Sequence, residues 1–176
     1  VSKNPEEYNL FIELLNRFEW ISLNDYYNHC RSLLINLSED LKNKRIFHLY
    51  TFPIIKKRHE KATKSGNVIS YLIKAIIPSI DFFKNIKFED INSFEDLKNK
   101  KINQSHATLL IDDFIGTGKT FNECVKEISN VNNKFLKQAS VLSLAIRKEA
   151  LEKIEKKFTV YYSISILKGI SDFNSD

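Results

Sequence analysis

The spacing of apolar residues changes along the chain and predicts a helical start followed by alternating strands and helices. Apolar side chains recur every three to four residues in five segments, which predicts amphipathic helices there: residues 5–18, 24–41, 68–76, 121–128 and 147–158. Shorter apolar runs predict strands at residues 45–55, 108–111, 140–146 and 159–166. Strands that alternate with helices pair in parallel through right-handed crossovers. We therefore predict an α/β fold with a central, mostly parallel sheet flanked by helices.

The two helices at the start of the chain precede the first predicted strand. Either Ser22 or Asn24 can cap the second of them, because both side chains accept hydrogen bonds from a helix N-terminus. We expect residues 1–42 to form an N-terminal helical extension packed on an α/β core of residues 43–176.

The stretch TLLIDDFIGTGKT, residues 108–120, holds the strongest candidate for a binding site. Its apolar start suits a strand buried on both faces, so the adjacent Asp112 and Asp113 fall at the carboxyl end of that strand. Ligands of open α/β sheets bind at that edge. Next, Gly116 and Gly118 allow positive φ, and threonine hydroxyls lie where a helix begins. We interpret this loop as a cradle for one phosphate group.

The ending GKT is also found in the P-loop of nucleotide-binding proteins, and glycine spacing tests that alternative. A P-loop needs a glycine five positions ahead of the glycine that precedes its lysine. Asp113 occupies that position, and its carboxylate would face the phosphates. A P-loop NTPase is therefore the weaker hypothesis.

A second anion site is predicted in the segment KKRHEKATKSGN, where cations gather ahead of a helix start. The chain has four glycines where average usage would give about twelve, and Gly66 falls in this segment. A diphosphate group would suit the start of that helix, at Ser65, Gly66 and Asn67. The alternative is a solvated, lysine-rich loop. The cations of the segment are Lys56, Lys57, Arg58, Lys61 and Lys64.

Composition fits one compact domain and limits the classes of partner. The chain has 176 residues, 43% of them hydrophobic, which can bury a substantial core. No apolar run approaches the roughly 18 residues of a membrane span. Cys30 and Cys124 fall at apolar helix positions, so we expect buried free thiols. From the lack of a long apolar run we also expect a cytoplasmic protein and no membrane partner. The net charge is +5, but acids are mixed among the bases and no stacking platform stands out, which disfavours nucleic-acid binding.

The segment LLIDDFIGTGKT resembles the phosphoribosyl diphosphate (PRPP) binding motif of type I phosphoribosyltransferases: apolar strand residues, two acids, two apolar residues and a threonine–glycine loop. The resemblance implies that family's fold. It implies that Asp112 and Asp113 hold the ribose hydroxyls, that residues 65–67 bind the diphosphate, and that Mg²⁺ arrives with the substrate. The residues implied to bind the 5′-phosphate are Gly116, Thr117, Gly118, Lys119 and Thr120.

Two departures from the family pattern bear on catalysis. Gly116 stands where purine-salvage members with a similar ending carry an aspartate that helps to move a proton on the purine ring, and Phe114 is bulkier than the usual residue. Standard purine salvage is therefore disfavoured. One hypothesis is a transferase that moves ribosyl phosphate to a nitrogenous base. The other is a non-catalytic sensor or effector subunit, since the motif also resembles phosphoribosyltransferase-like proteins of bacterial defence systems. A protein partner, a missing domain and a homodimer stay open.

Residues 79–106 are the least regular part of the sequence. They predict a short strand at residues 86–88 and a helical turn at residues 94–97. In type I phosphoribosyltransferases the corresponding interval holds a mobile loop that closes over the substrate, and the resemblance implies one here. The alternative is a plain surface connection.

Overall fold

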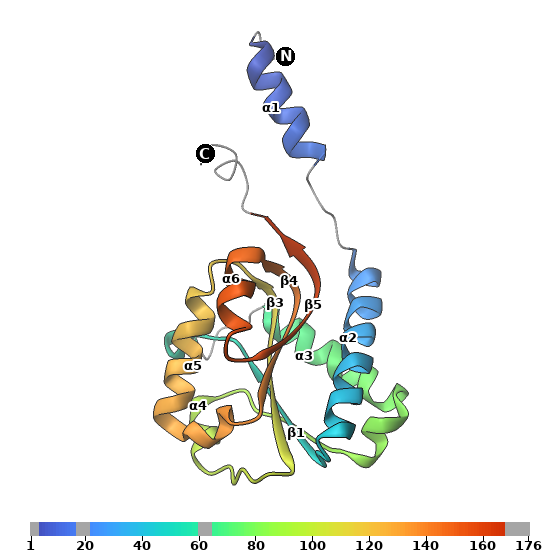
Figure 1. Ribbon diagram of the computed structural model, residues 1–176, viewed down its shortest axis with the longest axis vertical. Coiled ribbons are helices and arrows are strands. Elements are labelled where there is room, and N and C mark those ends of the chain that lie inside the picture. The colour runs from blue at the N-terminus through green and yellow to red at the C-terminus, as the bar shows by residue number, and fades with distance from the viewer. Residues whose placement is uncertain (1–3, 17–21, 60–64, 168–176) are drawn as a thin grey trace.

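A five-stranded parallel sheet forms the centre of the protein (Figure 1). The structure, a computed structural model, describes residues 4–16, 22–59 and 65–167. Its strands are β1 (His48–Pro53), β2 (Lys87–Asp90), β3 (His106–Ile115), β4 (Ala139–Arg147) and β5 (Thr159–Ile166). Neighbouring strands pair in parallel in the order β2-β1-β3-β4-β5, so β3 is central. The predicted α/β fold with a mostly parallel sheet is confirmed.

Helices cover both faces of the sheet, as a buried parallel sheet requires. One face packs against α2 (Leu23–Asn43) and α3 (Ser65–Ile76). The other face packs against α4 (Phe94–Lys98), α5 (Lys119–Asn132) and α6 (Lys148–Ile154) (Figure 1). Short 3-10 helices lie between these elements: η1 (Lys57–His59), η2 (Ile77–Ser79), η3 (Asp81–Asn85) and η4 (Asn133–Leu136).

The central strand explains why its sequence is apolar at consecutive positions. Successive side chains of a strand point to opposite faces. Leu109 and Ile111 are fully buried in the core beneath α2 and α3, whereas Leu110 is fully buried in the core beneath α4, α5 and α6. The strand therefore contributes to both cores, and its acidic residues come only near its carboxyl end.

The second helix begins at Ser22, which decides between the two predicted caps. The Ser22 Oγ accepts a hydrogen bond from the Asp25 N–H at 3.2 Å, and Asp25 Oδ2 accepts one from the Ser22 N–H at 3.1 Å. This reciprocal arrangement satisfies N–H groups that the helix start leaves unpaired. Tyr27 follows the apolar spacing of this helix but is 39% exposed. The buried apolar residues of the helix are Cys30, Leu33, Leu34, Leu37 and Leu41.

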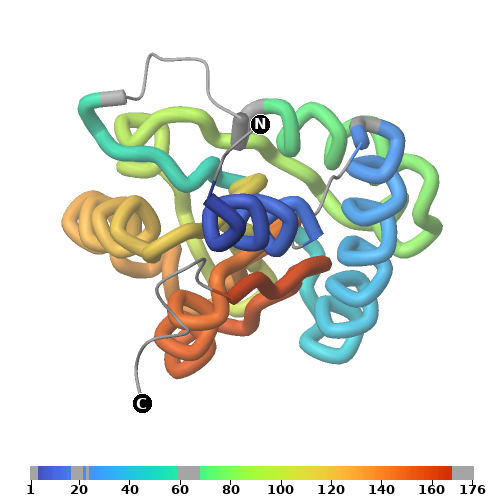
Figure 2. The backbone as a smooth tube through the Cα atoms, turned by 90° about the horizontal axis from the view of Figure 1, so that it is seen from above, coloured from blue at the N-terminus to red at the C-terminus, as the bar shows by residue number. Residues whose placement is uncertain are grey.

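The first helix, α1 (Pro5–Asn16), has no buried residue. Tyr8, Phe11 and Leu15 are each more than half exposed, at 54%, 58% and 53%. The carboxyl ends of the strands point to the top of Figure 1, where α1 stands beyond them, and Figure 2 looks down on the same end. Within the predicted extension, therefore, α2 packs on the core, whereas α1 buries no residue.

The irregular interval before β3 is folded, in contrast to the mobile loop that we expected. The predicted short strand is present as β2 and the predicted helical turn as α4. Phe83, Ile86 and Ile91 are buried, as are both apolar residues of α4. Because these side chains fill both cores, the interval cannot lift away without exposing them, and β2 instead forms one edge of the sheet.

Candidate functional site

The acid pair lies at the carboxyl end of the central strand, as predicted. Asp112 and Asp113 are both half-buried, between the buried Ile111 and the buried Ile115. The backbone N–H of Asp113 donates a hydrogen bond to Oδ1 of Asp112 at 3.1 Å. This contact places one carboxylate beside the backbone that carries the other.

Ser143 of β4 supports the backbone beneath the acid pair, although no motif in the sequence pointed to it. Asp112 pairs in register with Ser143, and the pairing resumes one step further with Phe114 and Ala145. The buried Ser143 hydroxyl donates to the Ala145 carbonyl oxygen at 2.8 Å and lies 3.5 Å from the carbonyl oxygen of Asp113. The hydroxyl therefore lies between β3 and β4, next to the part of β3 that carries the two acids.

The loop after the acid pair depends on one of its two glycines. Gly118 has φ 75° and is the N-cap of α5. A side chain is strained at this φ, so the glycine is required here. Gly116 differs from our expectation, since Gly118 is the positive-φ glycine among the described residues. A Cβ at Gly116 would lie 3.4 Å from Cε1 of Phe114, an ordinary contact.

The first turn of α5 presents unpaired backbone donors to this loop. The helix has no side-chain cap and no acidic residue in its first turn. The N–H of Lys119 makes only a long hydrogen bond, 3.4 Å, to Oγ1 of Thr117. Thr117 and Lys119 are exposed and Thr120 is half-buried. Free N–H groups together with the positive end of a helix dipole are typical of anion-binding sites.

Two cations of the predicted diphosphate segment are tied to α5. The Lys56 Nζ lies 3.0 Å from Oε2 of Glu123, and the Lys57 Nζ lies 3.8 Å from Oε2 of Glu127. The hydrogen bond from Lys56 holds the pKa of the Glu123 carboxyl below its usual value. These contacts hold the start of the connection after β1 against the helix. Lys61 of the same segment lies outside the described residues.

The remaining residues predicted for the diphosphate lie at the start of α3. Residues 65–67 form its first turn, and their side chains are outside the part of the chain that the structure describes. The helix connects the carboxyl end of β1 to the amino end of the parallel strand β2. Its first turn therefore lies at the carboxyl end of the strands, the same end of the sheet as Asp112 and Asp113. The diphosphate role stays a prediction.

Arg147 is a further residue on this rim and was not among the predicted site residues. It ends β4 and precedes α6, and its side chain is 18% exposed. Its Nη2 lies 3.1 Å from Oε2 of Glu149, while its Nε is buried without a hydrogen-bond partner. The signal in the sequence was present: an arginine directly after the apolar run of a strand, at the same edge as the acid pair.

The described residues do not form a metal-binding site by themselves. No group of three or more histidine, cysteine, aspartate or glutamate side chains among them could hold a metal ion. The carboxylates of Asp112 and Asp113 are hard oxygen donors, which suit Mg²⁺ that keeps waters and substrate phosphates among its ligands. No helix within the described residues is long and apolar enough to cross a membrane.

The chain belongs to the PRTase-CE family, whose model matches residues 2–175. The resemblance to phosphoribosyltransferases is confirmed, and the protein is a phosphoribosyltransferase-like domain. A search of curated proteins finds no match.

Solved structures with a similar fold are phosphoribosyltransferases. The hypoxanthine phosphoribosyltransferase of Trypanosoma cruzi, in complex with the product IMP, has a TM-score of 0.53 at 12% identity over 85% of this chain and 76% of that one. The enzyme of Leishmania tarentolae, in complex with GMP, has a TM-score of 0.50 at 11% identity over 86% and 82%. The enzyme of Schistosoma mansoni, in complex with IMP, has a TM-score of 0.49 at 15% identity; the match covers 80% of this chain and 64% of that one. The likeness to the Trypanosoma and Leishmania structures, at 12% and 11% identity, establishes the fold alone.

Proposed function

We propose that this domain binds PRPP or a related ribose phosphate, together with Mg²⁺, at the carboxyl rim of its sheet. The observation that carries the proposal is the order of groups around β3. The acid pair of Asp112 and Asp113 lies near the end of the strand, and Gly118, five positions after Asp113, starts a helix whose first N–H groups are open. Carboxylates accept hydrogen bonds from a ribose diol, and a helix N-terminus binds a phosphate.

The loop between strand and helix also supports this ligand over a nucleoside triphosphate. Only residues 116–118 separate β3 from α5. A loop this short, with an aspartate where a P-loop has its first glycine, cradles one phosphate and cannot wrap three. The 5′-phosphate would accept from the backbone of residues 118–120 and from the hydroxyls of Thr117 and Thr120.

Mg²⁺ fits this proposal as a partner of the substrate. The ion would supply positive charge against the diphosphate, while Asp112 and Asp113 would hold the ribose hydroxyls. Within the chain, Asp112 and Asp113 are the oxygen donors placed to orient those hydroxyls.

The transfer would need positioning more than proton chemistry from the protein. The bond between C1′ of the ribose and the diphosphate oxygen breaks, the diphosphate leaves with the electron pair, and a ring nitrogen of the base bonds to C1′. The proton of that nitrogen passes to solvent, since Gly116 carries no side chain to accept it. The acid pair stabilises positive charge that develops on the ribose, and Arg147 at the next strand end supplies a donor for an oxygen of the acceptor.

The alternative is a sensor or effector subunit, in a bacterial defence system, that binds the ligand without transferring it. Two observations favour it. Glycine replaces the proton-moving residue at Gly116, and Lys56 and Lys57 make ion pairs with α5 instead of presenting their full charge to a diphosphate. Both hypotheses use the same ribose and phosphate contacts, so ligand binding tests what they share.

Thermal unfolding with ligands tests the proposal directly. Mg²⁺-PRPP and ribose 5-phosphate should each stabilise the domain more than ATP at equal concentration. A ligand at a hundred times its dissociation constant adds about 2.7 kcal/mol to the free energy of unfolding, which raises the midpoint by several degrees. Stronger protection by ATP than by either ribose phosphate would overturn the proposal.

A further inference from the structure

A cavity lies at the amino ends of the strands, at the opposite end of the sheet from Asp112 and Asp113. Its volume is about 520 Å³. One wall is the connection from Lys98 to Ile102, which leads into β3, and the other is the end of α5 with the turn after it, residues 129–134. A cavity of this size falls in the range of small-molecule sites.

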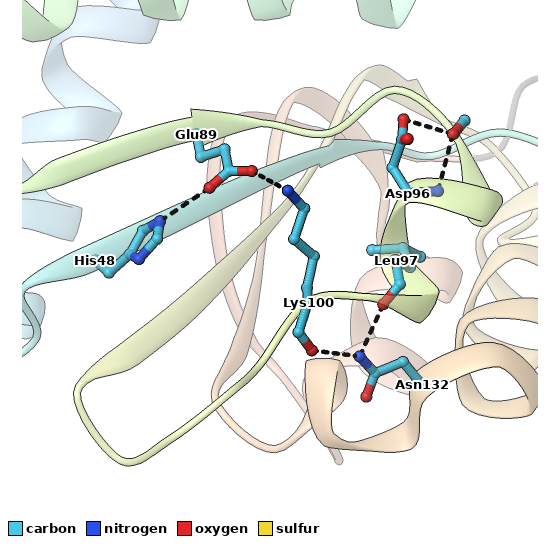
Figure 3. Close-up of polar contacts among 7 residues, drawn as sticks. His48, Glu89, Asp96, Leu97, Lys100 and Asn132 are labelled. Atoms are coloured by element: carbon cyan, nitrogen blue, oxygen red, sulfur yellow. Dashed lines mark hydrogen bonds and ion pairs between the residues drawn. The ribbon is translucent and has the colours of Figure 1, made fainter.

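The charge of this cavity is one-sided. Ten residues line it, and they include four lysines and no carboxylate. Lys98 lies 2.7 Å from Glu95, and Lys100 is hydrogen-bonded to Glu89 (Figure 3). The other two lysines, Lys101 and Lys134, form no ion pair within the described residues. The cavity therefore keeps uncompensated positive charge.

The walls of the cavity are held together before any ligand arrives. The Asn132 Nδ2 donates to the carbonyl oxygen of Leu97 at 2.9 Å and to that of Lys100 at 3.0 Å, so the end of α4 is fastened to the end of α5 (Figure 3). The hydrogen bond to Glu89 fixes the Lys100 side chain in turn and raises its pKa. Asn130 and Asn133, both exposed at the cavity, add amide donors and acceptors.

A helix end gives the lysines a competing, purely structural role. The carboxyl end of α5 carries about half a negative charge, and lysines nearby would stabilise it. That partial charge is smaller than the two charges of Lys101 and Lys134. A nucleic acid is the other alternative for a basic surface, but the four lysines line one open cavity between two segments of the chain.

We propose that this cavity binds a small phosphate-bearing ligand of about nucleotide size, separately from the site on the carboxyl rim. Lys101 and Lys134 would contact the phosphate groups, and Asn130 and Asn133 would hydrogen-bond the rest of the ligand. Because the two sites lie at opposite ends of the strands, a ligand here could bind at the same time as the ribose phosphate and would not compete with it. The proposal does not depend on the function proposed for the rim.

Site-resolved NMR titration tests it with inorganic triphosphate and AMP as probes, in the absence of Mg²⁺. The backbone amides of residues 129–134 report on this cavity, and those of residues 116–120 report on the rim. We expect both probes to shift the first set. In the double variant Lys101→Gln/Lys134→Gln the dissociation constant read from that set should rise at least about tenfold. A matched control, Lys126→Gln/Lys156→Gln, removes two exposed lysines elsewhere and should change it less than about twofold.

Three outcomes would overturn the proposal. In the first, the probes shift only residues 116–120. In the second, both double variants weaken binding equally, so that the effect is diffuse charge. In the third, a single-stranded RNA binds with a steep salt dependence and displaces the probes at equal phosphate concentration, which would make the surface a nucleic-acid site. Urea unfolding of each variant separates a lost ligand contact from a lost fold.

Discussion

The Nζ of Lys56 lies 3.0 Å from Oε2 of Glu123, and this contact joins the connection after β1 to α5, the helix that follows residues 116–118. The two residues are 67 positions apart in the sequence. The carboxylate of Glu123 offsets part of the positive charge of Lys56. Removing that carboxylate alone tests whether this charge matters for a ligand at the rim.

Replacing Glu123 with Gln should increase the affinity for Mg²⁺-PRPP about two- to fivefold, because Lys56 is released and a negative charge near the ligand is lost. The free energy of unfolding should change little, since the Glu123 side chain is 43% exposed and exposed ion pairs contribute little to stability. Isothermal titration calorimetry measures the affinity. The control is Glu127→Gln, which removes the same charge from the longer contact to Lys57; an equal gain in both variants would show a general charge effect.

Replacing Gly118 with Ala should destabilise the domain by about 1–3 kcal/mol, because φ 75° is unfavourable for any residue with a Cβ. Gly116→Ala is the matched control, since its Cβ would make only an ordinary contact with Phe114. We expect a change below about 0.5 kcal/mol there. Urea unfolding measures both free energies. Similar losses in the two variants would contradict the assignment of the turn to Gly118.

The sequence predicted the elements and the acid pair because both depend on local pattern. β5 spans Thr159–Ile166, the same residues as the apolar run that predicted it. Asp112 and Asp113 could be placed at a strand end because a polar pair follows an apolar run directly. The capping serine could be narrowed to two candidates from residue type alone, although the hydrogen bonds of Ser22 were needed to choose.

The rest of the site depends on which segments meet in three dimensions. Ser143 and Arg147 become relevant only when β4 lies beside β3, and a single sequence does not give that register. The pairing of Lys56 with Glu123 and the clamp from Asn132 to the end of α4 likewise join distant segments. For the same reason the closing loop was wrongly expected, since the burial of Phe83 and Ile91 follows from the sheet and not from local pattern.

Stability should fall as the pH rises above 9, and Cys30 should account for part of the fall. Burial raises the pKa of the Cys30 thiol from 9.0 to about 11. Between these values the unfolded chain loses the proton and the folded chain keeps it, so the thiol favours folding below pH 9 and that contribution is lost as the pH approaches 11. The loss should approach about 2–3 kcal/mol.

Urea unfolding between pH 8 and 11 should therefore show a shallower decline for Cys30→Ala than for the parent protein. Burial and the hydrogen bond with Asp40 also raise the pKa of Tyr161, so the variant keeps part of the decline. Tyr161→Phe removes that second contribution and should flatten the curve above pH 10. Identical slopes in the parent and in Cys30→Ala would show that the thiol ionises without cost to the fold.

The acid pair separates the enzyme from the sensor, because both bind ribose but only one breaks a bond. Asp112→Asn and Asp113→Asn keep the shape of the side chains and remove one charge each. Each should weaken Mg²⁺-PRPP binding about tenfold or more, since hydrogen bonds to a charged acceptor are worth roughly 1.5–3 kcal/mol. In a transferase they should also slow the release of diphosphate from PRPP, measured with an acceptor base present. If the protein is a sensor, the variants should bind PRPP more weakly, and neither the parent nor the variants should release diphosphate. If both single variants and the double variant bind PRPP as the parent does, the ribose is held elsewhere and the role assigned to Asp112 and Asp113 is wrong.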